Sequence, residues 1–224
     1  MEIYDRWTHI HNRIRQACIR VDRNPDDVTV LAVTKNADDA AVAAARDLGI
    51  LHMGENRIQQ ARRRRQAFPD IHWHFIGTLQ TNKVKYCRDF ALIHSLDRWR
   101  LAEALNRQAE RWKTPIAVLV QVNPGGEEQK HGLATDEARR FVHQVAAECP
   151  HLTVRGLMSM APFVEDPETV RPVFRWVKQL QSQLQADGFE VPVLSMGMTN
   201  DYEVAVEEGA TLVRIGSALF REEV

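Results

Sequence analysis

Hydrophobic residues recur along the chain in two alternating patterns. Short, mostly apolar runs such as Ile116–Val122 are typical of buried parallel strands, which are covered on both faces. Between these runs, apolar residues stand three and four positions apart, as in the segment from Val170 to Leu184, and this spacing is typical of amphipathic helices. The alternation predicts an α/β fold in which helices connect successive strands.

The predicted elements occupy almost the whole chain. The predicted strands are Val28–Thr34, Ile50–Met53, His72–Ile76, Ala91–His94, Ile116–Val122, Thr153–Met158, Pro192–Met196 and Thr211–Ile215. The predicted helices are residues 1–21, Asp38–Leu48, Asn56–Ala67, Thr81–Arg88, Arg98–Trp112, Asp136–Cys149, Glu168–Asp187 and Asn200–Glu208. Eight strands alternating with helices over residues 28–220 predict a (β/α)8 TIM barrel with an extra N-terminal helix. A doubly wound open sheet is the alternative, because alternation alone does not distinguish the two folds.

The length and the net charge limit the classes of protein to which this chain can belong. The chain has 224 residues, slightly fewer than the roughly 250 of a typical TIM barrel, so we expect residues 1–224 to form one domain. The formal net charge of −1 gives no overall field that favours nucleic acid or an anionic membrane. The run Arg62–Arg65 is a local exception, and we interpret it as the solvated face of a helix.

The cysteines and the N-terminal residues indicate the cellular compartment in which we expect the protein. Cys18, Cys87 and Cys149 are odd in number and widely spaced, which favours neither a disulfide framework nor a zinc site. Charged residues interrupt the apolar residues at the start, so no signal peptide is predicted, and no stretch approaches the roughly 18 apolar residues of a membrane span. We therefore expect a cytoplasmic protein.

Lys35 is the first residue that suggests chemistry. It follows the first predicted strand, and the strand periodicity places it on the same face as Leu31 and Val33. In a barrel this face points inward, so we expect Lys35 at the mouth, where burial disfavours the ammonium form. A neutral lysine amine can form a Schiff base with an aldehyde. The alternative is a lysine that extends into solvent.

The loops after the last two strands suggest a phosphate site. TIM barrels often bind phosphate there, at the N-terminus of a short extra helix. Gly216 and Ser217 follow the last strand, and their N–H groups can bind an anion, while Ser195 and Thr199 around Gly197 supply hydroxyl groups. A phosphate together with an aldehyde on Lys35 predicts pyridoxal phosphate as the cofactor.

Two further sets of polar residues lie on strands. Arg214 faces opposite to its neighbours Val213 and Ile215, so we expect it to point inward. It can contact the pyridine nitrogen of the cofactor, or it can form a structural salt bridge with a carboxylate such as Glu55. His72 and His74 share one strand face, but no carboxylate or cysteine accompanies them, so we interpret them as packed histidines and predict no metal site.

Several motifs closely resemble those of the pyridoxal phosphate homeostasis proteins, the family called YggS in bacteria and proline synthase co-transcribed homologue in animals. In this sequence the motifs span residues 32–220 in the order of that family. They are Ala32-Val33-Thr34-Lys35, Gly54-Glu55-Asn56, His74-Phe75-Ile76-Gly77-Thr78-Leu79-Gln80-Thr81-Asn82-Lys83, Gly156-Leu157-Met158-Ser159-Met160-Ala161-Pro162, Leu194-Ser195-Met196-Gly197-Met198 and Val213-Arg214-Ile215-Gly216-Ser217-Ala218-Leu219-Phe220.

The resemblance implies a barrel like the N-terminal domain of alanine racemase, with pyridoxal 5′-phosphate in Schiff-base linkage to Lys35. It implies phosphate contacts from Ser195, Thr199, Gly216 and Ser217, with Arg214 near the pyridine nitrogen. The full implied cofactor-binding set is Lys35, Asn56, His74, Ser195, Met196, Gly197, Thr199, Arg214, Gly216 and Ser217. Members of the family are regarded as carriers that buffer and deliver the cofactor in vitamin B6 homeostasis, without established catalysis.

The sequence departs from the family pattern at two places. Thr199 stands where serine is usual, which keeps the hydroxyl, and Arg221 stands where glycine is common. Lys130 is a second amine that we consider as a transient acceptor of the aldehyde during transfer. The expected partners are the cofactor and the apo-enzymes that receive it, and we expect a monomer.

The alternative function is that of a racemase acting on amino acids. A racemase of the alanine type needs an acid/base group on the opposite face of the cofactor ring, supplied in that enzyme as a tyrosine from a second domain. The only tyrosines here, Tyr4, Tyr86 and Tyr202, lie on predicted helical segments. The sequence therefore favours the carrier.

Overall fold

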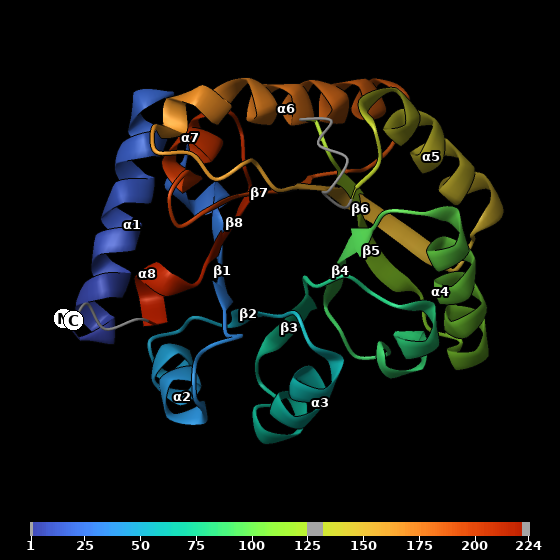
Figure 1. Ribbon diagram of the computed structural model, residues 1–224, viewed down its shortest axis with the longest axis horizontal. Helices are drawn as coiled ribbons and strands as arrows, with labels where there is room; N and C mark the ends of the chain where they lie inside the picture. Colours follow the sequence, from blue (N-terminus) through green and yellow to red (C-terminus); the bar gives the residue numbers. More distant parts are fainter. Residues whose placement is uncertain (1, 125–131, 221–224) are drawn as a thin grey trace.

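Eight parallel strands close into a barrel, and each strand pairs with its neighbours in the sequence (Figure 1). The computed structural model describes residues 2–124 and 132–220. The last strand pairs with the first, with Thr29 opposite Leu212 and Ala32 opposite Ile215, and this pairing closes the sheet. The predicted TIM barrel is confirmed, and the open-sheet alternative is wrong.

The strands occupy the predicted segments, with several shifted ends. They are β1 Thr29–Val33, β2 His52–Glu55, β3 His72–Phe75, β4 Leu92–Leu96, β5 Ile116–Val122, β6 Leu152–Ser159, β7 Val193–Met198 and β8 Leu212–Ile215. The largest consequence for the site is at β7, which continues beyond the predicted end at Met196. Gly197, which the sequence placed in the loop after the strand, therefore lies inside β7 together with Ser195.

The helices surround the barrel (Figure 1). They are α1 Ile3–Arg20, α2 Asp39–Asp47, α3 Ile58–Ala67, α4 Trp99–Trp112, α5 Thr135–Glu148, α6 Arg171–Ala186, α7 Tyr202–Glu207 and α8 Ser217–Phe220, with 3-10 segments η1 Pro25–Asp27, η2 Thr81–Tyr86 and η3 Pro167–Val170. The prediction of an ordinary helix over Thr81–Arg88 is wrong. Its buried residues Val84 and Cys87 stand three positions apart, which matches the three-residue turn of a 3-10 helix. Among the described residues, no helix has the length and apolar character needed to cross a membrane.

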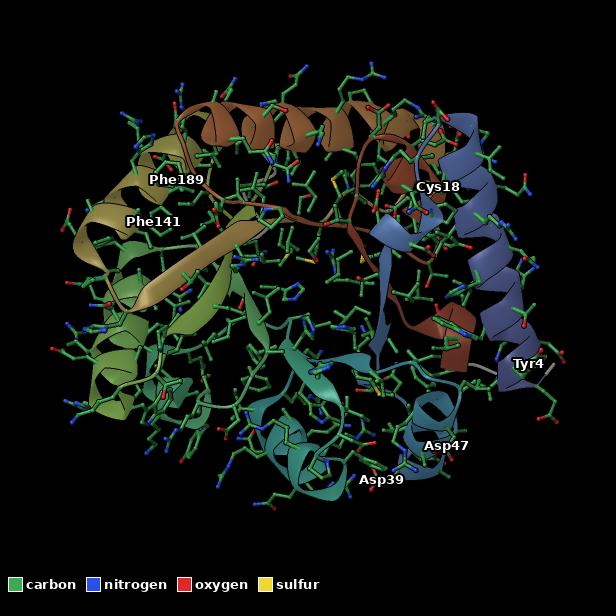
Figure 2. All side chains as sticks on the ribbon, turned by 180° about the vertical axis from the view of Figure 1, so that it is seen from behind. Tyr4, Cys18, Asp39, Asp47, Phe141 and Phe189 are labelled. Atoms are coloured by element: carbon green, nitrogen blue, oxygen red, sulfur yellow. The ribbon has the colours of Figure 1, made fainter. Side chains whose placement is uncertain are left out.

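The strands divide the buried residues into two groups, one between the barrel and the helices and one inside the barrel. Outward-facing residues such as Val30 and Ala32 pack with the helices in the large hydrophobic core. Inward-facing residues include Leu31 and its register partner Arg214, and Figure 2 shows side chains that extend into the space inside the barrel. A small apolar cluster around Leu119 lies apart from the outer core, and polar groups such as His74, His94 and Arg214 are also buried inside the barrel.

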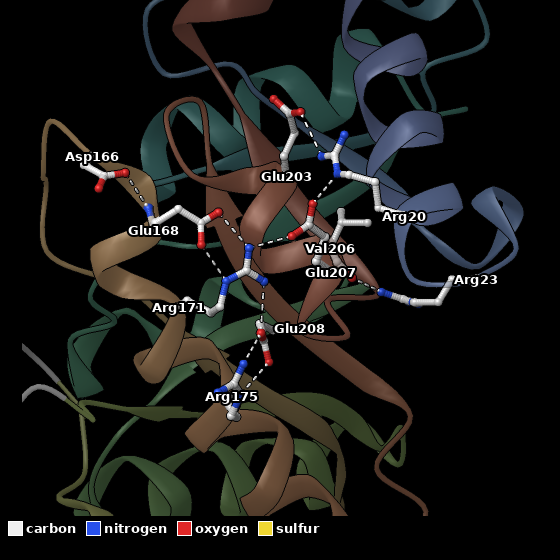
Figure 3. A network of polar contacts seen from close by, with 10 residues as sticks. All are labelled: Arg20, Arg23, Asp166, Glu168, Arg171, Arg175, Glu203, Val206, Glu207 and Glu208. Carbon is white, nitrogen blue, oxygen red and sulfur yellow. Dashed lines mark hydrogen bonds and ion pairs between the residues drawn. The ribbon is translucent and has the colours of Figure 1, made fainter.

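A network of ion pairs connects the N-terminal helix α1 with α6 and α7 (Figure 3). On α1, Arg20 pairs with Glu203 at 3.3 Å and with Glu207 at 2.6 Å, both on α7. Arg171, at the start of α6, pairs with Glu207 at 2.6 Å and with Glu208 at 3.0 Å. Because two arginines share these carboxylates, the network links α1, α6 and α7.

Candidate functional site

A pocket of about 600 Å³ opens at the C-terminal mouth of the barrel. Its lining residues come from the ends of β1, β2, β3, β6, β7 and β8 and from the segments that follow them. Six residues of the sequence-based set line it, namely Lys35, Asn56, Thr199, Arg214, Gly216 and Ser217. The closed barrel is what brings residues from the first strand beside residues from the last two.

Lys35 lines this pocket, but it is not buried. The side chain of Thr34 is buried, whereas Lys35 and Asn36 are exposed. The expectation of a desolvated lysine is therefore wrong, because β1 ends at Val33 and Lys35 stands beyond it, at an open mouth that water reaches. The predicted inward placement is correct, since Lys35 and Val33 line the same pocket.

A buried arginine holds the segment that carries Lys35. Arg64, 1% exposed, donates hydrogen bonds to the carbonyl oxygen of Thr34 at 2.7 Å and to that of Ala37. It also forms an ion pair with Glu55, which is fully buried and accepts from the Thr34 hydroxyl at 2.5 Å. The interpretation of the arginine run as a solvated face is wrong at this position. Arg64 fixes the chain on both sides of Lys35.

Two hydroxyl groups meet where the segments after β7 and β8 line the pocket. Ser217 Oγ and Thr199 Oγ1 are 3.3 Å apart, although they come from the segments after β8 and β7. Ser217 is the first residue of α8, and the first N–H groups of a helix have no partner within the helix. These donors and the two hydroxyls form a surface that can bind an oxyanion.

Arg214 lies between these groups and the barrel interior. Its Nη1 donates to the carbonyl oxygen of Ser195 at 2.7 Å and to the Ser195 hydroxyl at 2.8 Å, and its Nη2 donates to the Ser159 carbonyl at 2.8 Å. The alternative of a salt bridge to Glu55 is wrong. Burial lowers the pKa of Arg214 to about 10, and the negative charge of Asp201 opposes this shift, so the guanidinium is charged at neutral pH.

Four residues of the sequence-based set do not line the pocket. Ser195 is fully buried beneath Arg214, with its hydroxyl engaged, and Met196 packs in the outer core. Gly197 adopts a φ of 89° and approaches Tyr202 and Ala205 so closely that a Cβ would clash with both. His74, 4% exposed, lies inside the barrel. Their contact with a cofactor stays a prediction.

His74 belongs to a row of histidines inside the barrel. Its two ring nitrogens are within hydrogen-bond distance of His52 and His94, at 3.0 Å and 2.9 Å. Burial, and next the neighbouring histidines, lower the pKa of His74 to about 3, and burial lowers the pKa of His94 well below its usual value. The interpretation as a packed histidine fits His74, whereas His72 is exposed and only its ring lies near that of His52, with centroids 5.0 Å apart. The lowered pKa values keep His74 and His94 neutral at neutral pH.

Several residues of the pocket are not in the cofactor-binding set that the resemblance implies. Asp201 lines the pocket, and its carboxylate accepts from the Met198 N–H at 2.6 Å while burial raises its pKa. Gly77 also lines it, and a Cβ there would lie 2.3 Å from the carbonyl oxygen of Asn56, so only glycine fits this close approach. Gly77 follows a predicted strand within one of the family motifs, and Asp201 ends the segment after the seventh predicted strand, but the sequence assigned neither residue a role of its own. Lys130 lies outside the described residues.

Residues 8–223 match the family model described as alanine racemase, N-terminal domain. The chain belongs to this family. It is 40% identical to a pyridoxal phosphate homeostasis protein of Aquifex aeolicus, over 99% of each chain, and 35% identical to the protein of the same name from Escherichia coli K12, over 98% of this chain and 96% of that one. Within the family, it therefore belongs with the pyridoxal phosphate homeostasis proteins.

Solved structures of the family have the same fold. PipY of Synechococcus elongatus, with pyridoxal phosphate bound, superposes with a TM-score of 0.81 at 33% identity, covering 95% of this chain and 100% of that one. A protein from Bifidobacterium adolescentis described as unknown gives a TM-score of 0.90 at 33% identity, covering 97% of this chain and 94% of that one. Alanine racemase of Clostridium difficile shares the fold at 13% identity, with a TM-score of 0.76, and this chain covers 55% of it.

Proposed function

We propose that this protein binds pyridoxal 5′-phosphate at the C-terminal mouth of the barrel, holds it reversibly, and buffers and delivers it without catalysing a reaction of its own. The observation that supports this proposal is the composition of one pocket. A primary amine, an oxyanion-binding surface and a buried arginine line it together. These three features match the aldehyde, the phosphate and the pyridine nitrogen of the cofactor. PipY, a relative with the same fold, has been solved with pyridoxal phosphate bound.

Lys35 supplies the covalent attachment. Its amine, when neutral, adds to the aldehyde carbon, and loss of one water leaves a carbon–nitrogen double bond. Addition of water reverses the step and restores both the amine and the aldehyde, so the link suits a carrier that must release its cargo. Arg64 supports this step by fixing the backbone on both sides of Lys35.

Thr199, Ser217 and the start of α8 bind the phosphate. The two hydroxyls, 3.3 Å apart, can both donate to phosphate oxygens, together with the backbone N–H groups at the start of the helix. The pocket volume of about 600 Å³ lies within the roughly 300–1,000 Å³ that is usual for small-molecule sites. The phosphate contacts are separate from the covalent link, so each holds the cofactor independently.

Arg214 binds the pyridine nitrogen. A guanidinium has five N–H donors and no acceptor, and in this protein three of the five donate to Ser195 and Ser159. The remaining donors can contact a ring nitrogen only if that nitrogen is unprotonated. An unprotonated ring withdraws electrons weakly, which disfavours the carbanion chemistry of racemases and supports a carrier role.

The tyrosines also favour the carrier over the racemase. Tyr4 is exposed on α1, Tyr86 belongs to η2, and Tyr202 is buried on α7, where burial raises its pKa to about 12. Among the described residues that line the pocket, none is a tyrosine. The described residues that line the pocket therefore include no tyrosine phenol that could transfer a proton at the cofactor ring.

The Lys35→Ala variant tests the proposal. The wild-type protein with pyridoxal phosphate should be yellow, and borohydride reduction should fix the cofactor on Lys35, as peptide mapping can show. The variant should lose this adduct yet retain weaker binding, because the phosphate contacts remain. Lys85→Ala, at an exposed position on η2, is the control and should behave as the wild type. An adduct on another lysine, or no residual binding by Lys35→Ala, would contradict the assignment.

A further inference from the structure

A continuous row of polar groups crosses the barrel from one mouth to the other. Arg214 lines the large pocket and donates to Ser195 Oγ at 2.8 Å. Ser195 Oγ is 3.0 Å from His94 Nδ1, His94 Nε2 is 2.9 Å from His74 Nδ1, and His74 Nε2 is 3.0 Å from His52 Nδ1. The row draws on β8, β7, β4, β3 and β2, so only the closed barrel assembles it.

The hydrogen atoms of this row can be assigned from donor and acceptor capacity. Arginine can only donate, so the Ser195 oxygen accepts from Arg214. If the oxygen also accepted from His94, the serine hydrogen would be left in the fully buried interior without an acceptor, which costs about 1–3 kcal/mol. Ser195 therefore donates its hydrogen to His94 Nδ1.

The same assignment continues along the row. Because His94 accepts at Nδ1, its single hydrogen is on Nε2, and it donates to His74 Nδ1. His74 in turn carries its hydrogen on Nε2 and donates to His52 Nδ1. Every hydrogen bond therefore points from the large pocket toward the opposite mouth. Neutral imidazoles are required, because a protonated ring has no acceptor, and the lowered pKa values of His74 and His94 agree with this.

The row ends at a second, smaller pocket. It has a volume of about 240 Å³ and is lined by the first residues of several strands, including His52 and His72, with Arg155 beside them. His52 is half-buried there, so its Nε2–H can donate to water. The hydrogen on His52 Nε2, at the far end of the row, therefore needs no other side chain as its acceptor.

We propose that His94, with His74 and His52 behind it, positions Arg214 for the cofactor by orienting the Ser195 hydroxyl. Because His94 takes the serine hydrogen, a lone pair of the oxygen faces Nη1, and the guanidinium is fixed at this point and at two carbonyl oxygens. The donors that remain on Arg214 are then aligned for the pyridine nitrogen. This inference rests on the proposed function, since the ring nitrogen is the group that Arg214 is aligned to meet.

The hydrogen positions can be tested without the cofactor. Long-range ¹H–¹⁵N NMR spectra of the cofactor-free protein labelled on histidine distinguish the two neutral tautomers. The expected result at neutral pH is the Nε2–H tautomer at His52, His74 and His94. An Nδ1–H tautomer or a charged ring at His94 would overturn the proposal.

The effect on the site can be tested with ligands that lack the aldehyde. Pyridoxamine phosphate carries both the ring and the phosphate, whereas inorganic phosphate carries only the anion. Ser195→Ala should weaken pyridoxamine phosphate binding about 5- to 10-fold, the equivalent of one hydrogen bond, and should change inorganic phosphate binding less than about twofold. Ser195→Thr, which keeps a hydroxyl, should restore most of the affinity. His72→Gln, an exposed neighbour outside the row, is the control and should match the wild type.

The outcomes separate this inference from the proposed function. Equal losses for both ligands in Ser195→Ala would indicate a general structural defect and overturn the positioning role, as would unchanged affinity for pyridoxamine phosphate. Failure of the wild-type protein to bind pyridoxal phosphate would overturn the proposed function and, with it, the role toward the ring. A wrong tautomer with normal cofactor binding would overturn the positioning inference alone.

Discussion

At the scale of single residues, Arg63 and Arg64 are sequence neighbours with opposite environments. Arg63 is 64% exposed and pairs with Asp39, whose side chain is 43% exposed. Arg64 is 1% exposed and pairs with the fully buried Glu55. An exposed pair contributes at most about 1 kcal/mol, whereas removing one partner of a buried pair leaves a charge without compensation and costs about 3–5 kcal/mol.

We therefore expect Arg64→Ala to lower the free energy of unfolding by about 3–5 kcal/mol, as measured by urea denaturation. Arg63→Ala, the matched control, should change it by less than about 1 kcal/mol. Because Arg64 also binds the carbonyl oxygens of Thr34 and Ala37, its variant should slow attachment of pyridoxal phosphate to Lys35. Equal stabilities of the two variants would contradict the assignment of Arg64 to a buried pair.

The sequence already contained a signal for this difference. Ile58, Ala61 and Arg64 are the buried positions of α3 and stand three residues apart, so the arginine continues an apolar stripe. The run of four arginines hid this signal, because charge alone indicated a solvated face. The partner could not be predicted, since Glu55 lies on a different element and the fold alone brings the two together.

At the scale of elements, the helices α1 and α8 show how a remote segment supports the part of the pocket that we propose binds phosphate. Arg6 on α1 is 8% exposed, and its Nε donates to the carbonyl oxygen of Leu219 at 2.7 Å. Leu219 belongs to α8, whose first residue, Ser217, lines the pocket. A helix of four residues has little stability of its own, so α1 contributes to holding α8 in place.

Arg6→Ala should therefore act on both stability and ligand binding. We expect the free energy of unfolding to fall by about 1–3 kcal/mol, because a buried carbonyl loses its donor, and binding of inorganic phosphate to weaken. Arg15→Ala, at an exposed position of the same helix, should change stability by no more than about 0.5 kcal/mol. Unchanged phosphate affinity in Arg6→Ala would show that α8 does not depend on this contact.

Strand β7 marks the limit of what the sequence could predict about the elements. The order of strands and helices follows from apolar periodicity, and so do Lys35 and Arg214 as pocket residues. Gly197, however, indicated a loop, whereas it lies within β7 at a register shift between Ser195 and Met198. A glycine inside a strand often marks such an irregularity. Ser195 lies inside the strand beneath Arg214, whereas Met198, Thr199, Asn200 and Asp201 line the pocket.

At the scale of the whole molecule, the barrel has a polar interior surrounded by an apolar layer. The helices pack on the strands through hydrophobic residues, whereas the inside of the barrel holds His74, His94, Ser195 and Arg214, all nearly or fully buried. These groups satisfy one another by hydrogen bonds. The molecule thus places polar groups where they can support the pocket, while the outer core supplies the hydrophobic stabilisation.

This arrangement makes the stability of the whole barrel sensitive to mild acid. Burial lowers the folded-state pKa of His74 from 6.5 to about 3, and burial lowers the pKa of His94 in the same direction. The unfolded chain therefore binds more protons below pH 6.5 than the folded chain does. The stabilisation is complete above about pH 6.5 and is lost as the pH falls, by up to about 1.4 kcal/mol per pH unit for each histidine.

Urea denaturation of the cofactor-free protein between pH 7 and pH 5 measures this dependence. Carboxylates with lowered pKa values, such as Glu168 and Glu208, contribute only at lower pH, because their usual value is 4.5. His74→Gln should show a smaller decrease over this range than the wild type, even if it is less stable at pH 7, because one buried titrating group is gone. His72→Gln, which removes an exposed histidine, should keep the wild-type slope. A wild-type stability that stays constant from pH 7 to pH 5 would contradict the neutral histidine row, because burial of uncharged imidazoles requires this loss.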